Sequence, residues 1–349
     1  MQQVIEGISA LKKIVEGLGG KRLFLVAGSS LDMLPIKGSI ETLPVQTVRF
    51  SGFTPNPEQN QVDDALGLFR DSCCDAILAV GGGSAMDLAK CLKMAVLEER
   101  NIPLIAVPTT AGSGSESTQN AVVYCCGVKQ SVSHPSLLPN YAILEPSALK
   151  TLPLYQKKCA MMDALCQGIE SWWSKGSTAE SISYSKECIR LIVSNWREYI
   201  FGPDGGGKAA AAVMLGANFS GKAINIAKTT APHAMSYKLT KMYGIPHGHA
   251  VALCLPGVWE YMQKNVENCA AGISKGVFDE IAASLGAGDG PLFIRTMLAE
   301  LGLHKIESAG DRDAELDTLT RAVNMERLRN SPLPLDTQAI QDIYNGILI

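Results

Sequence analysis

Short apolar runs alternate with helical patterns over the first 150 residues of the chain. Runs that are apolar throughout predict strands buried on both faces, and such strands form parallel sheets covered by helices. The segments between them carry apolar residues three and four positions apart, which is typical of amphipathic helices. The first part of the chain therefore predicts an α/β domain with a parallel sheet. Its strands are expected at 22–28, 45–50, 74–80, 102–108 and 141–146.

The pattern changes after Pro153, where strand-like runs become scarce and alanine, methionine and leucine dominate. This second part predicts an all-helical domain. A chain of 349 residues suits two domains, which we place at 1–152 and 153–349. Helices are expected at 155–174, 178–200, 207–227, 247–264, 271–285, 290–302, 314–328 and 337–346.

Composition narrows the class of partner. The net charge of −3 offers no basic surface for nucleic acid or an anionic membrane. No apolar stretch reaches the length of a membrane span, and the first 20 residues read as a helix or a strand–helix start and not as a signal peptide. Ten cysteines without a CxxC pair are typical of reduced thiols. We expect a cytoplasmic protein that binds a small molecule.

A glycine-rich turn follows the strand predicted at 74–80. Gly81, Gly82, Gly83 and Ser84 lead into a helix, and free amides at a helix start bind phosphate. Asp87 lies in the first turn of that helix, where it can cap the helix or contact a ligand. The sequence is not the GxGxxG pattern of a Rossmann site, and a simple tight turn is the alternative.

A second polar loop follows the next predicted strand. Small hydroxyl residues at the carboxyl end of a strand suit ribose and phosphate contacts, although a flexible Ser-Gly loop has the same composition. Two such loops on successive strands favour a nucleotide crevice at this edge of the sheet. The candidate side chains of this loop are Thr109, Thr110, Ser113 and Ser115.

Four polar residues stand out in the apolar second half. Asp163 and Gln167 are four residues apart and share one face of a helix. His233 and His247 are two of only five histidines in the chain. One carboxylate and two imidazoles that converge on a point bind a divalent metal.

Together these motifs resemble the iron-containing alcohol dehydrogenase family, which shares its fold with glycerol dehydrogenase and dehydroquinate synthase. The resemblance implies an N-terminal nucleotide-binding α/β domain, a helical C-terminal domain and an active site in the cleft between them. It also implies hydride transfer between a nicotinamide and a carbonyl carbon, with Fe²⁺ or Zn²⁺ as metal, and usually a homodimer. The residues that carry it are Asn56-Pro57, Gly81–Lys90, Pro108–Glu116, Asp163–Glu170, His233–Met235 and Pro246–Gly248.

The metal ligands implied by the resemblance are Asp163, His233 and His247, and the fourth position is Gln167. The family usually has histidine at this fourth position. An amide oxygen is a harder and weaker donor than imidazole. Three interpretations stay open: a weak fourth ligand, a three-ligand site with an extra water, or a site that has lost its metal.

The resemblance places further residues near the cofactor. Tyr237 occupies a position where many relatives carry histidine near the nicotinamide, so it can be a proton donor or a packed tyrosine. His249 is either a second route for the proton or structural. Asn56 is assigned to the cofactor. NAD-preferring relatives place an aspartate at Gly28, which is followed here by Ser29 and Ser30, so NADP(H) is favoured over NAD(H).

The substrate assignment depends on lysines. Lys222 and Lys228 precede His233 on a predicted helix, and they either face solvent or bind an anionic substrate. The surrounding motifs look like the phosphonoacetaldehyde reductase branch, and Asn120 matches a pocket position. We therefore expect a small aldehyde or alcohol substrate, with phosphonoacetaldehyde as the leading candidate. The alternatives are a sugar-phosphate cyclase of the dehydroquinate synthase type, a glycerol or other polyol dehydrogenase, and a metal-free binding protein.

Overall fold

The computed structural model describes residues 2–20 and 22–349 and forms two compact units. The first unit consists of Met1–Pro153 and Arg197–Gly221, and the second of Leu154–Trp196 and Lys222–Ile349. The segment Arg197–Gly221, which the sequence placed in the second domain, packs with the first unit. That the chain folds as two independent domains, 1–152 and 153–349, stays a prediction.

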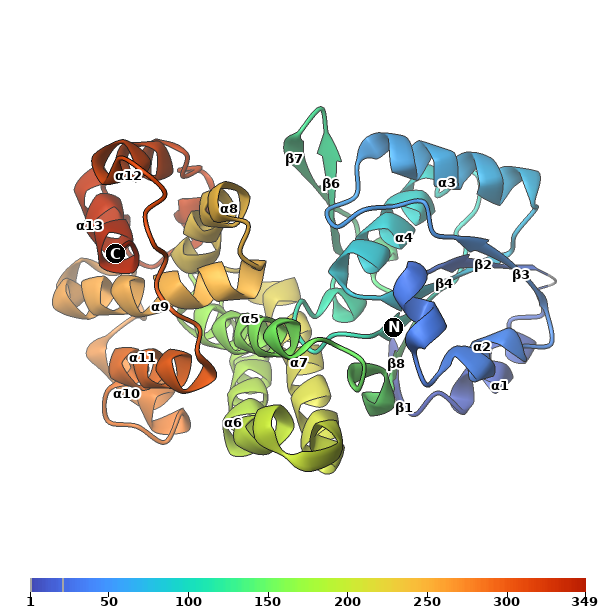
Figure 1. Cartoon of the computed structure of the whole chain (residues 1–349), viewed down its shortest axis with the longest axis horizontal. Coiled ribbons are helices and arrows are strands. Elements are labelled where there is room, and N and C mark those ends of the chain that lie inside the picture. Colours follow the sequence, from blue (N-terminus) through green and yellow to red (C-terminus); the bar gives the residue numbers. More distant parts are fainter. Residues whose placement is uncertain (1, 21) are drawn as a thin grey trace. The chain divides into compact units, whose positions relative to one another are not determined.

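The first unit contains the predicted parallel sheet (Figure 1). It has six strands in the order β1-β8-β5-β4-β2-β3, and every neighbouring pair is parallel. The strand–helix reading of the N-terminus is the one the structure adopts, since β1 adds an edge strand before the first helix. The strands are β1 (Gln3–Glu6), β2 (Arg22–Val26), β3 (Gln46–Phe50), β4 (Ala76–Gly81), β5 (Leu104–Pro108) and β8 (Tyr141–Leu144).

Helices cover both faces of this sheet (Figure 1). Alternate residues of a strand point to opposite faces. On β2, Leu23 and Leu25 pack in the core beside α1 (Ala10–Gly17) and α2 (Lys37–Glu41). Phe24 and Val26 pack in the core beneath α3 (Gln59–Asp71) and α4 (Gly83–Ala95). Burial on both faces explains why β2 is apolar at every position after Arg22.

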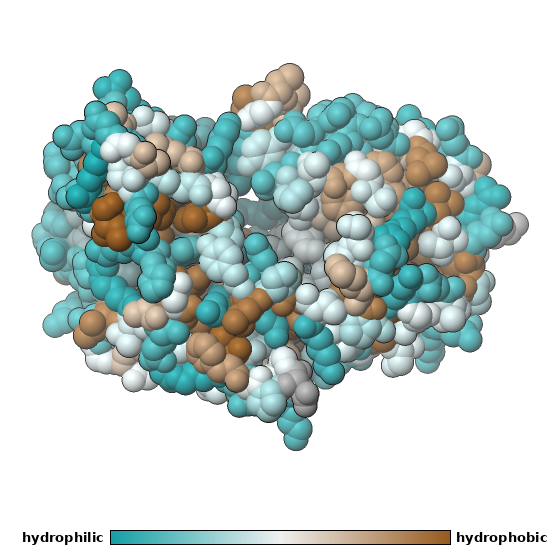
Figure 2. Space-filling model, viewed as in Figure 1, coloured by the Kyte–Doolittle hydropathy of each residue, from teal (hydrophilic) through white to brown (hydrophobic). Residues whose placement is uncertain are grey.

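A two-stranded antiparallel hairpin, β6 (Asn120–Cys125) and β7 (Val128–Ser133), forms a separate sheet that the sequence did not predict. Its turn is Cys126-Gly127, which lacks the usual Asn-Gly signal although both residues have positive φ, 51° and 74°. The hairpin tip carries hydrophobic side chains at the surface (Figure 2), and Val128 is 59% exposed.

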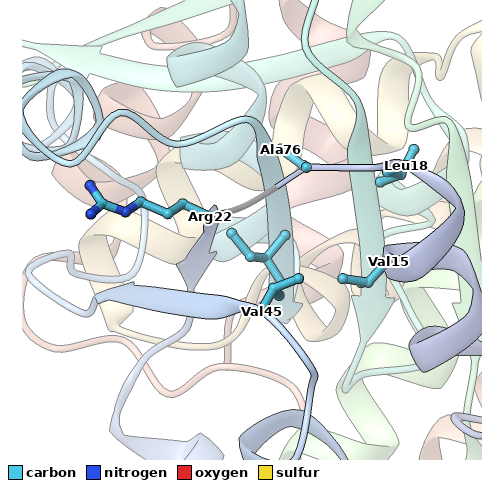
Figure 3. Close-up of a pocket in the computed structure, with 7 residues that line it drawn as sticks. Val15, Leu18, Arg22, Val45 and Ala76 are labelled. Atoms are coloured by element: carbon cyan, nitrogen blue, oxygen red, sulfur yellow. The ribbon is translucent and has the colours of Figure 1, made fainter.

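A small apolar pocket lies at the amino ends of β2, β3 and β4 (Figure 3). Val15, Leu18, Val45 and Ala76 line it, and the side chain of Arg22 at its edge points away from these four residues. Ligands of parallel sheets bind at the carboxyl ends of the strands, where the glycine-rich turn lies. This pocket is therefore a packing feature at the wrong end of the strands for a nucleotide.

The second unit is helical, as predicted, and within the described residues no helix combines the length and apolar character needed to cross a membrane. The helix expected at 314–328 ends at Arg321 and is followed by a short 3-10 turn at Arg327–Asn330, and α8 is an additional helix. The helices after Pro153 are α5 (Leu154–Trp173), α6 (Ala179–Phe201), α7 (Gly207–Ala227), α8 (Ala231–Tyr243), α9 (His247–Lys264), α10 (Lys275–Ser284), α11 (Gly290–Leu301), α12 (Arg312–Arg321) and α13 (Thr337–Ile347). The end of α6 and most of α7 belong to the first unit.

Short 3-10 turns connect the main elements. They are Ser29–Met33, Ser115–Ser117, Pro135–Leu137, Pro146–Leu149, Pro203–Gly206, Val266–Asn268 and Arg327–Asn330.

Candidate metal centre and nucleotide site

One face of α5 presents three buried polar residues. Asp163, Gln167 and Glu170 are spaced four and three residues apart, so they lie above one another along the helix. Asp163 is 7% exposed, Gln167 4% and Glu170 0%. Burial of so many polar groups is unfavourable unless each has a partner, so this face needs ligands from neighbouring elements.

Two other helices bring histidines to this face. His233 is the third residue of α8, and His247 is the first residue of α9. The next residue, Gly248, packs directly against α5: a Cβ built there would lie 2.0 Å from the carbonyl oxygen of Cys159. Only glycine permits so close an approach, and this contact holds the start of α9 beside Asp163.

The three predicted ligands converge. Nε2 of His233 lies 3.3 Å from Oδ1 of Asp163, and Nε2 of His247 lies 4.0 Å from the same oxygen. One ligand atom from each of the three residues lies within 4.8 Å of the other two. Oδ1 of Asp163 and Nε2 of His233 are buried without a hydrogen-bond partner. Because buried polar atoms need partners, these orphaned atoms fit a divalent metal.

Glu170 orients one of the ligands. Its Oε1 lies 2.5 Å from Nδ1 of His233, and its Oε2 accepts from the backbone and hydroxyl of Thr230, at 2.7 and 3.0 Å. With a proton on Nδ1, the other ring nitrogen is directed at Asp163. Sequence reasoning did not assign Glu170 a role, although its position seven residues after Asp163 placed it on the same helix face. Ser236 makes the equivalent contact with Nδ1 of His247, at 3.2 Å.

The charges at this centre reinforce each other. Burial opposes ionisation of Asp163, but His233 and His247 hold the pKa of its carboxyl below the ordinary value. Burial also opposes protonation of His233, yet Glu170 and Asp163 raise its pKa to about 9. Without a metal, His233 is therefore protonated and positively charged at neutral pH. Metal binding displaces the proton from its Nε2 atom.

Gln167 lies at the same centre. Its side chain donates a hydrogen bond to Asp163 and contributes to lowering the pKa of that carboxyl. Ligation of the metal by Gln167 stays a prediction, as do the ligand roles of the other three residues.

Tyr237 lies beside a predicted ligand. Its ring is parallel to that of His247, with 5.6 Å between centroids. The guanidinium of Arg327 covers the tyrosine ring at 5.1 Å, and its Nη1 donates to the hydroxyl at 3.4 Å. Burial raises the pKa of Tyr237 and Arg327 opposes that rise. No sequence motif pointed to Arg327, which belongs to the short turn Arg327–Asn330.

His249 has partners at both ring nitrogens. Nε2 lies 2.9 Å from the carbonyl oxygen of His304, so it carries the proton, and Nδ1 accepts from the Tyr155 hydroxyl at 2.9 Å. Burial lowers the pKa of His249. A catalytic role for His249 stays a prediction.

In the first unit the two predicted nucleotide loops contact each other. A Cβ at Gly82 would lie 3.2 Å from Cγ2 of Thr110, and one at Gly83 would lie 3.4 Å from Oγ of Ser113. Gly82 is the N-cap of α4, so the amides of this helix start face the second loop. The backbone amide of Asn56 donates to Oγ of Ser84 at 3.1 Å, which adds a third loop to the same edge.

A buried lysine joins these loops. Lys90 of α4 donates to Ser115, at its carbonyl oxygen (2.5 Å) and hydroxyl (2.9 Å), and to the Asn120 carbonyl at 2.8 Å. Ser115 in turn donates to Asp87 at 3.2 Å. Burial raises the pKa of Asp87 to about 6 and lowers that of Lys90 to about 8. Asp87 does not cap α4, because Gly82 is the N-cap and Asp87 instead contacts Ser115.

These contacts leave the assigned ligand roles in the first unit untested. Contacts of Thr109, Ser113, Ser115 and Asp87 with a cofactor, and of Asn120 with substrate, stay predictions.

The end of β2 carries an arginine that the sequence did not single out. Arg49 of β3 lies opposite Leu25 in the parallel register. Its Nη2 donates to the Gly28 carbonyl at 2.6 Å, and its Nη1 lies 3.0 Å from Oδ1 of Asp32. Ser29 and Ser30 begin the short turn that follows Gly28. The pairing of β3 with β2 thus brings the guanidinium of Arg49 beside the turn of Gly28, Ser29 and Ser30, the residues assigned to the cofactor.

The two candidate substrate lysines differ in the structure. The ammonium of Lys222 lies 5.7 Å from the centroid of the Tyr184 ring. Lys228 follows the last residue of α7 and has a left-handed backbone, with φ of 64°. Asn330 fixes this backbone by donating to the carbonyls of Ala227 and Thr229, at 2.8 and 2.9 Å. Partial burial lowers the pKa of Lys228.

Comparison with known proteins agrees with this arrangement. The model of the iron-containing alcohol dehydrogenase family matches residues 3–146, and the model of the C-terminal part of the Fe-containing alcohol dehydrogenase family matches residues 158–348. The chain is 31% identical to 1,3-propanediol dehydrogenase from Citrobacter freundii, over 86% of this chain and 80% of that protein.

The names of two further relatives refer to the reduction of charged aldehydes. Phosphonoacetaldehyde reductase from Streptomyces viridochromogenes is 30% identical over 76% of this chain and 74% of its own length. The structure of sulfoacetaldehyde reductase from Bifidobacterium kashiwanohense in complex with NAD⁺ superimposes with a TM-score of 0.88, at 25% identity, covering 99% of this chain and 96% of that one. The chain belongs to the iron-containing alcohol dehydrogenase family and is a metal-dependent, NAD(P)-linked alcohol dehydrogenase or aldehyde reductase.

Proposed function

We propose that the enzyme reduces a small anionic aldehyde to its primary alcohol with NADPH, and that phosphonoacetaldehyde, giving 2-hydroxyethylphosphonate, is the leading substrate. The observation that carries the proposal is Lys228, a cation with a fixed left-handed backbone in the same compact unit as the three metal ligands. Residues held in sparsely populated backbone regions cluster at functional sites. The names of two relatives, both reductases of anionic aldehydes, support the same substrate class.

Different residues of this chain would bind the metal, orient its ligands and donate the proton. Asp163, His233 and His247 would hold Fe²⁺ or Zn²⁺, which when bound supplies Lewis-acid polarisation of the substrate carbonyl. Glu170 and Ser236 orient the two imidazoles. We assign the proton donor to Tyr237, because its ring stacks on that of the predicted ligand His247 and Arg327 opposes the rise that burial causes in its pKa. Arg327 stabilises the phenolate that proton donation leaves.

Lys228→Ala is expected to raise KM for phosphonoacetaldehyde about tenfold to a hundredfold, because a hydrogen bond to a charged group contributes about 1.5–3 kcal/mol. The KM for a neutral aldehyde of similar size should stay within a factor of about two. The measurement is steady-state kinetics with both aldehydes. Lys241→Ala, an exposed lysine of α8, is the matched control. If Lys228→Ala changed the KM values for the anionic and the neutral aldehyde equally, Lys228 would not bind the anionic group of the substrate.

The proposed preference for NADP(H) has two supports. No carboxylate stands at Gly28 itself to repel a 2′-phosphate, and Arg49, which also pairs with Asp32, places a guanidinium against the carbonyl of Gly28. An arginine near the end of the first strands is a usual partner of the 2′-phosphate. Ser29 and Ser30 add hydroxyls at the same turn.

Gly28→Asp is expected to shift the ratio of kcat/KM for NADPH to that for NADH at least about tenfold towards NADH. The new carboxylate repels the 2′-phosphate and pairs with Arg49. A side chain fits there, since φ is −68° and the nearest atom to a built Cβ is 3.8 Å away. Gly38→Asp, which adds the same charge where a Cβ meets nothing within 4 Å, is the control. If the ratio of kcat/KM for NADPH to that for NADH did not change in Gly28→Asp, the 2′-phosphate of NADPH would bind away from residue 28.

A neutral diol is the second candidate substrate. The identity to 1,3-propanediol dehydrogenase, 31%, is as high as that to the phosphonate enzyme, 30%. A panel of aldehydes and alcohols, tested with both cofactors and followed by nicotinamide absorbance, separates the two. A kcat/KM higher for a neutral aldehyde or diol than for phosphonoacetaldehyde would overturn the anionic assignment. Turnover of a sugar phosphate without net cofactor oxidation would indicate the cyclase alternative.

We further propose a cytoplasmic location and a homodimer. The location is supported by the cysteines, all ten of which are free thiols, as expected in a reducing compartment. The homodimer rests on the usual state of the family.

A further inference from the structure

The tip of the β6–β7 hairpin carries two neighbouring thiols that the reaction does not use. Cys125 is the last residue of β6 and pairs with Val128 across the turn, and Cys126 is the first residue of the turn itself. Both cysteines are free and exposed. The neighbouring Cys126 side chain raises the pKa of the Cys125 thiol. The hairpin turn therefore presents two adjacent thiols to solvent.

Turn chemistry does not account for these residues. Two-residue hairpin turns with positive φ at both positions favour Asn, Asp or Gly at the first position. Here the first position is Cys126, with φ of 51°, although cysteine gains nothing from the left-handed conformation. Free cysteine is usually among the most buried residue types, whereas both members of this pair face solvent.

We propose that Cys125 and Cys126 form a dithiol site that chelates a soft, thiophilic centre, of which a trivalent arsenic compound is the representative. Soft thiolate ligands select soft ions, and two of them on one turn bind as a chelate. With an organic arsenic(III) oxide, both S–H bonds break, two As–S bonds form, and the oxide oxygen leaves with the two protons as water. Arsenic stays trivalent, so the step needs no oxidant.

A second pair of adjacent cysteines provides an internal contrast. Cys73 is exposed and has positive φ, 48°, like Cys126. Its neighbour Cys74 is 0% exposed, and burial raises the pKa of Cys74 to about 11. That pair offers a single thiol to solvent and cannot chelate. Sequence adjacency alone is therefore not enough, and the exposure of both thiols distinguishes the hairpin pair.

The dithiol site is connected to the cofactor loops. The amide of Tyr124, the residue before Cys125, donates to the Pro57 carbonyl at 2.8 Å. The amide of Asn56, the residue before Pro57, donates to Ser84 of the glycine-rich turn at 3.1 Å. A rigid ring across the two sulfurs restrains the end of β6 and, through these bonds, the position of Asn56. We expect occupation of the dithiol site to weaken binding of the nicotinamide cofactor.

The binding test uses the full-length, reduced enzyme and phenylarsine oxide. Native mass spectrometry should show a single arsenic atom bound per chain. A dithiol such as 2,3-dimercaptopropanol should remove this arsenic, whereas a monothiol should not. Cys125→Ser and Cys126→Ser should each abolish retention against the monothiol, while Cys73→Ser leaves it intact. Circular dichroism confirms that each variant is folded. Retention in either hairpin variant, or removal of the arsenic from the wild type by the monothiol, would overturn the site.

The coupling test measures cofactor affinity by nicotinamide fluorescence. Phenylarsine oxide should weaken NADPH or NADH binding to the wild type about fivefold and leave the affinity of Cys126→Ser unchanged. An arsenic-loaded wild type with unaltered cofactor affinity would overturn the link to Asn56. This test is independent of the substrate proposed above, because it uses no aldehyde.

Discussion

His247→Ala is expected to abolish tight metal binding and to lower kcat/KM for aldehyde reduction about a thousandfold or more. His247 supplies one of the three ligand atoms that converge within 4.8 Å. A Lewis acid at a carbonyl oxygen contributes several kcal/mol to the transition state, and about 4 kcal/mol corresponds to a thousandfold. Metal analysis of anaerobically purified protein and steady-state kinetics measure the two effects.

The control for this variant is His304→Ala. The His304 side chain is exposed, and the contact that this residue makes with His249 uses its backbone carbonyl. Metal content and kcat/KM should therefore stay at the wild-type level. If His247→Ala retained metal and turned over at the wild-type rate, the metal centre would lie at other residues.

Gln167→His is expected to tighten metal binding at least about tenfold, because imidazole is a better donor than an amide oxygen to Fe²⁺ or Zn²⁺. Residue 167 is one helical turn from Asp163 and is in contact with its carboxylate, so an imidazole there has the metal position within reach. Competition with a fluorescent chelator measures the affinity. The result does not depend on the identity of the substrate.

Gln167→Leu decides between the interpretations of the wild-type residue. Near-wild-type affinity in Gln167→Leu identifies a three-ligand site, whereas loss of metal affinity shows that the amide contributes, either as a fourth ligand or through its hydrogen bond to Asp163. If Gln167→His bound metal no more tightly than the wild type, residue 167 would not face the ion.

The strands of the sheet could be predicted because burial on both faces leaves a local signature. Each of β2, β4, β5 and β8 is apolar along nearly its whole length. The β6–β7 hairpin has no such signature: its turn lacks Asn-Gly, and β7 is exposed at most positions. Its pairing depends on contacts such as that of Tyr124 with Pro57, which are distant in sequence.

The site shows the same division. Asp163, His233 and His247 could be recognised from residue type and spacing, and the structure brings them together. Glu170 was detectable only as a helix-face neighbour of Asp163. Arg49 and Arg327 could not be found from sequence, since strand register places one and a distant turn places the other. The kind of side chain at each position can be read from the sequence. The residues that shift its pKa or orient it are brought there by tertiary contacts, which the sequence does not show.

The contact between Gly248 and the Cys159 carbonyl has a consequence for how this centre can change over evolution. The main chains of α9 and α5 touch there, so the distance from His247 to Asp163 is set by backbone and not by the ligands themselves. Exchanges at position 167 leave this distance intact, and a lineage can therefore adjust metal affinity by one substitution. A side chain at 248 would separate the two helices and remove the centre altogether. The most constrained position of the centre is thus a residue that binds nothing.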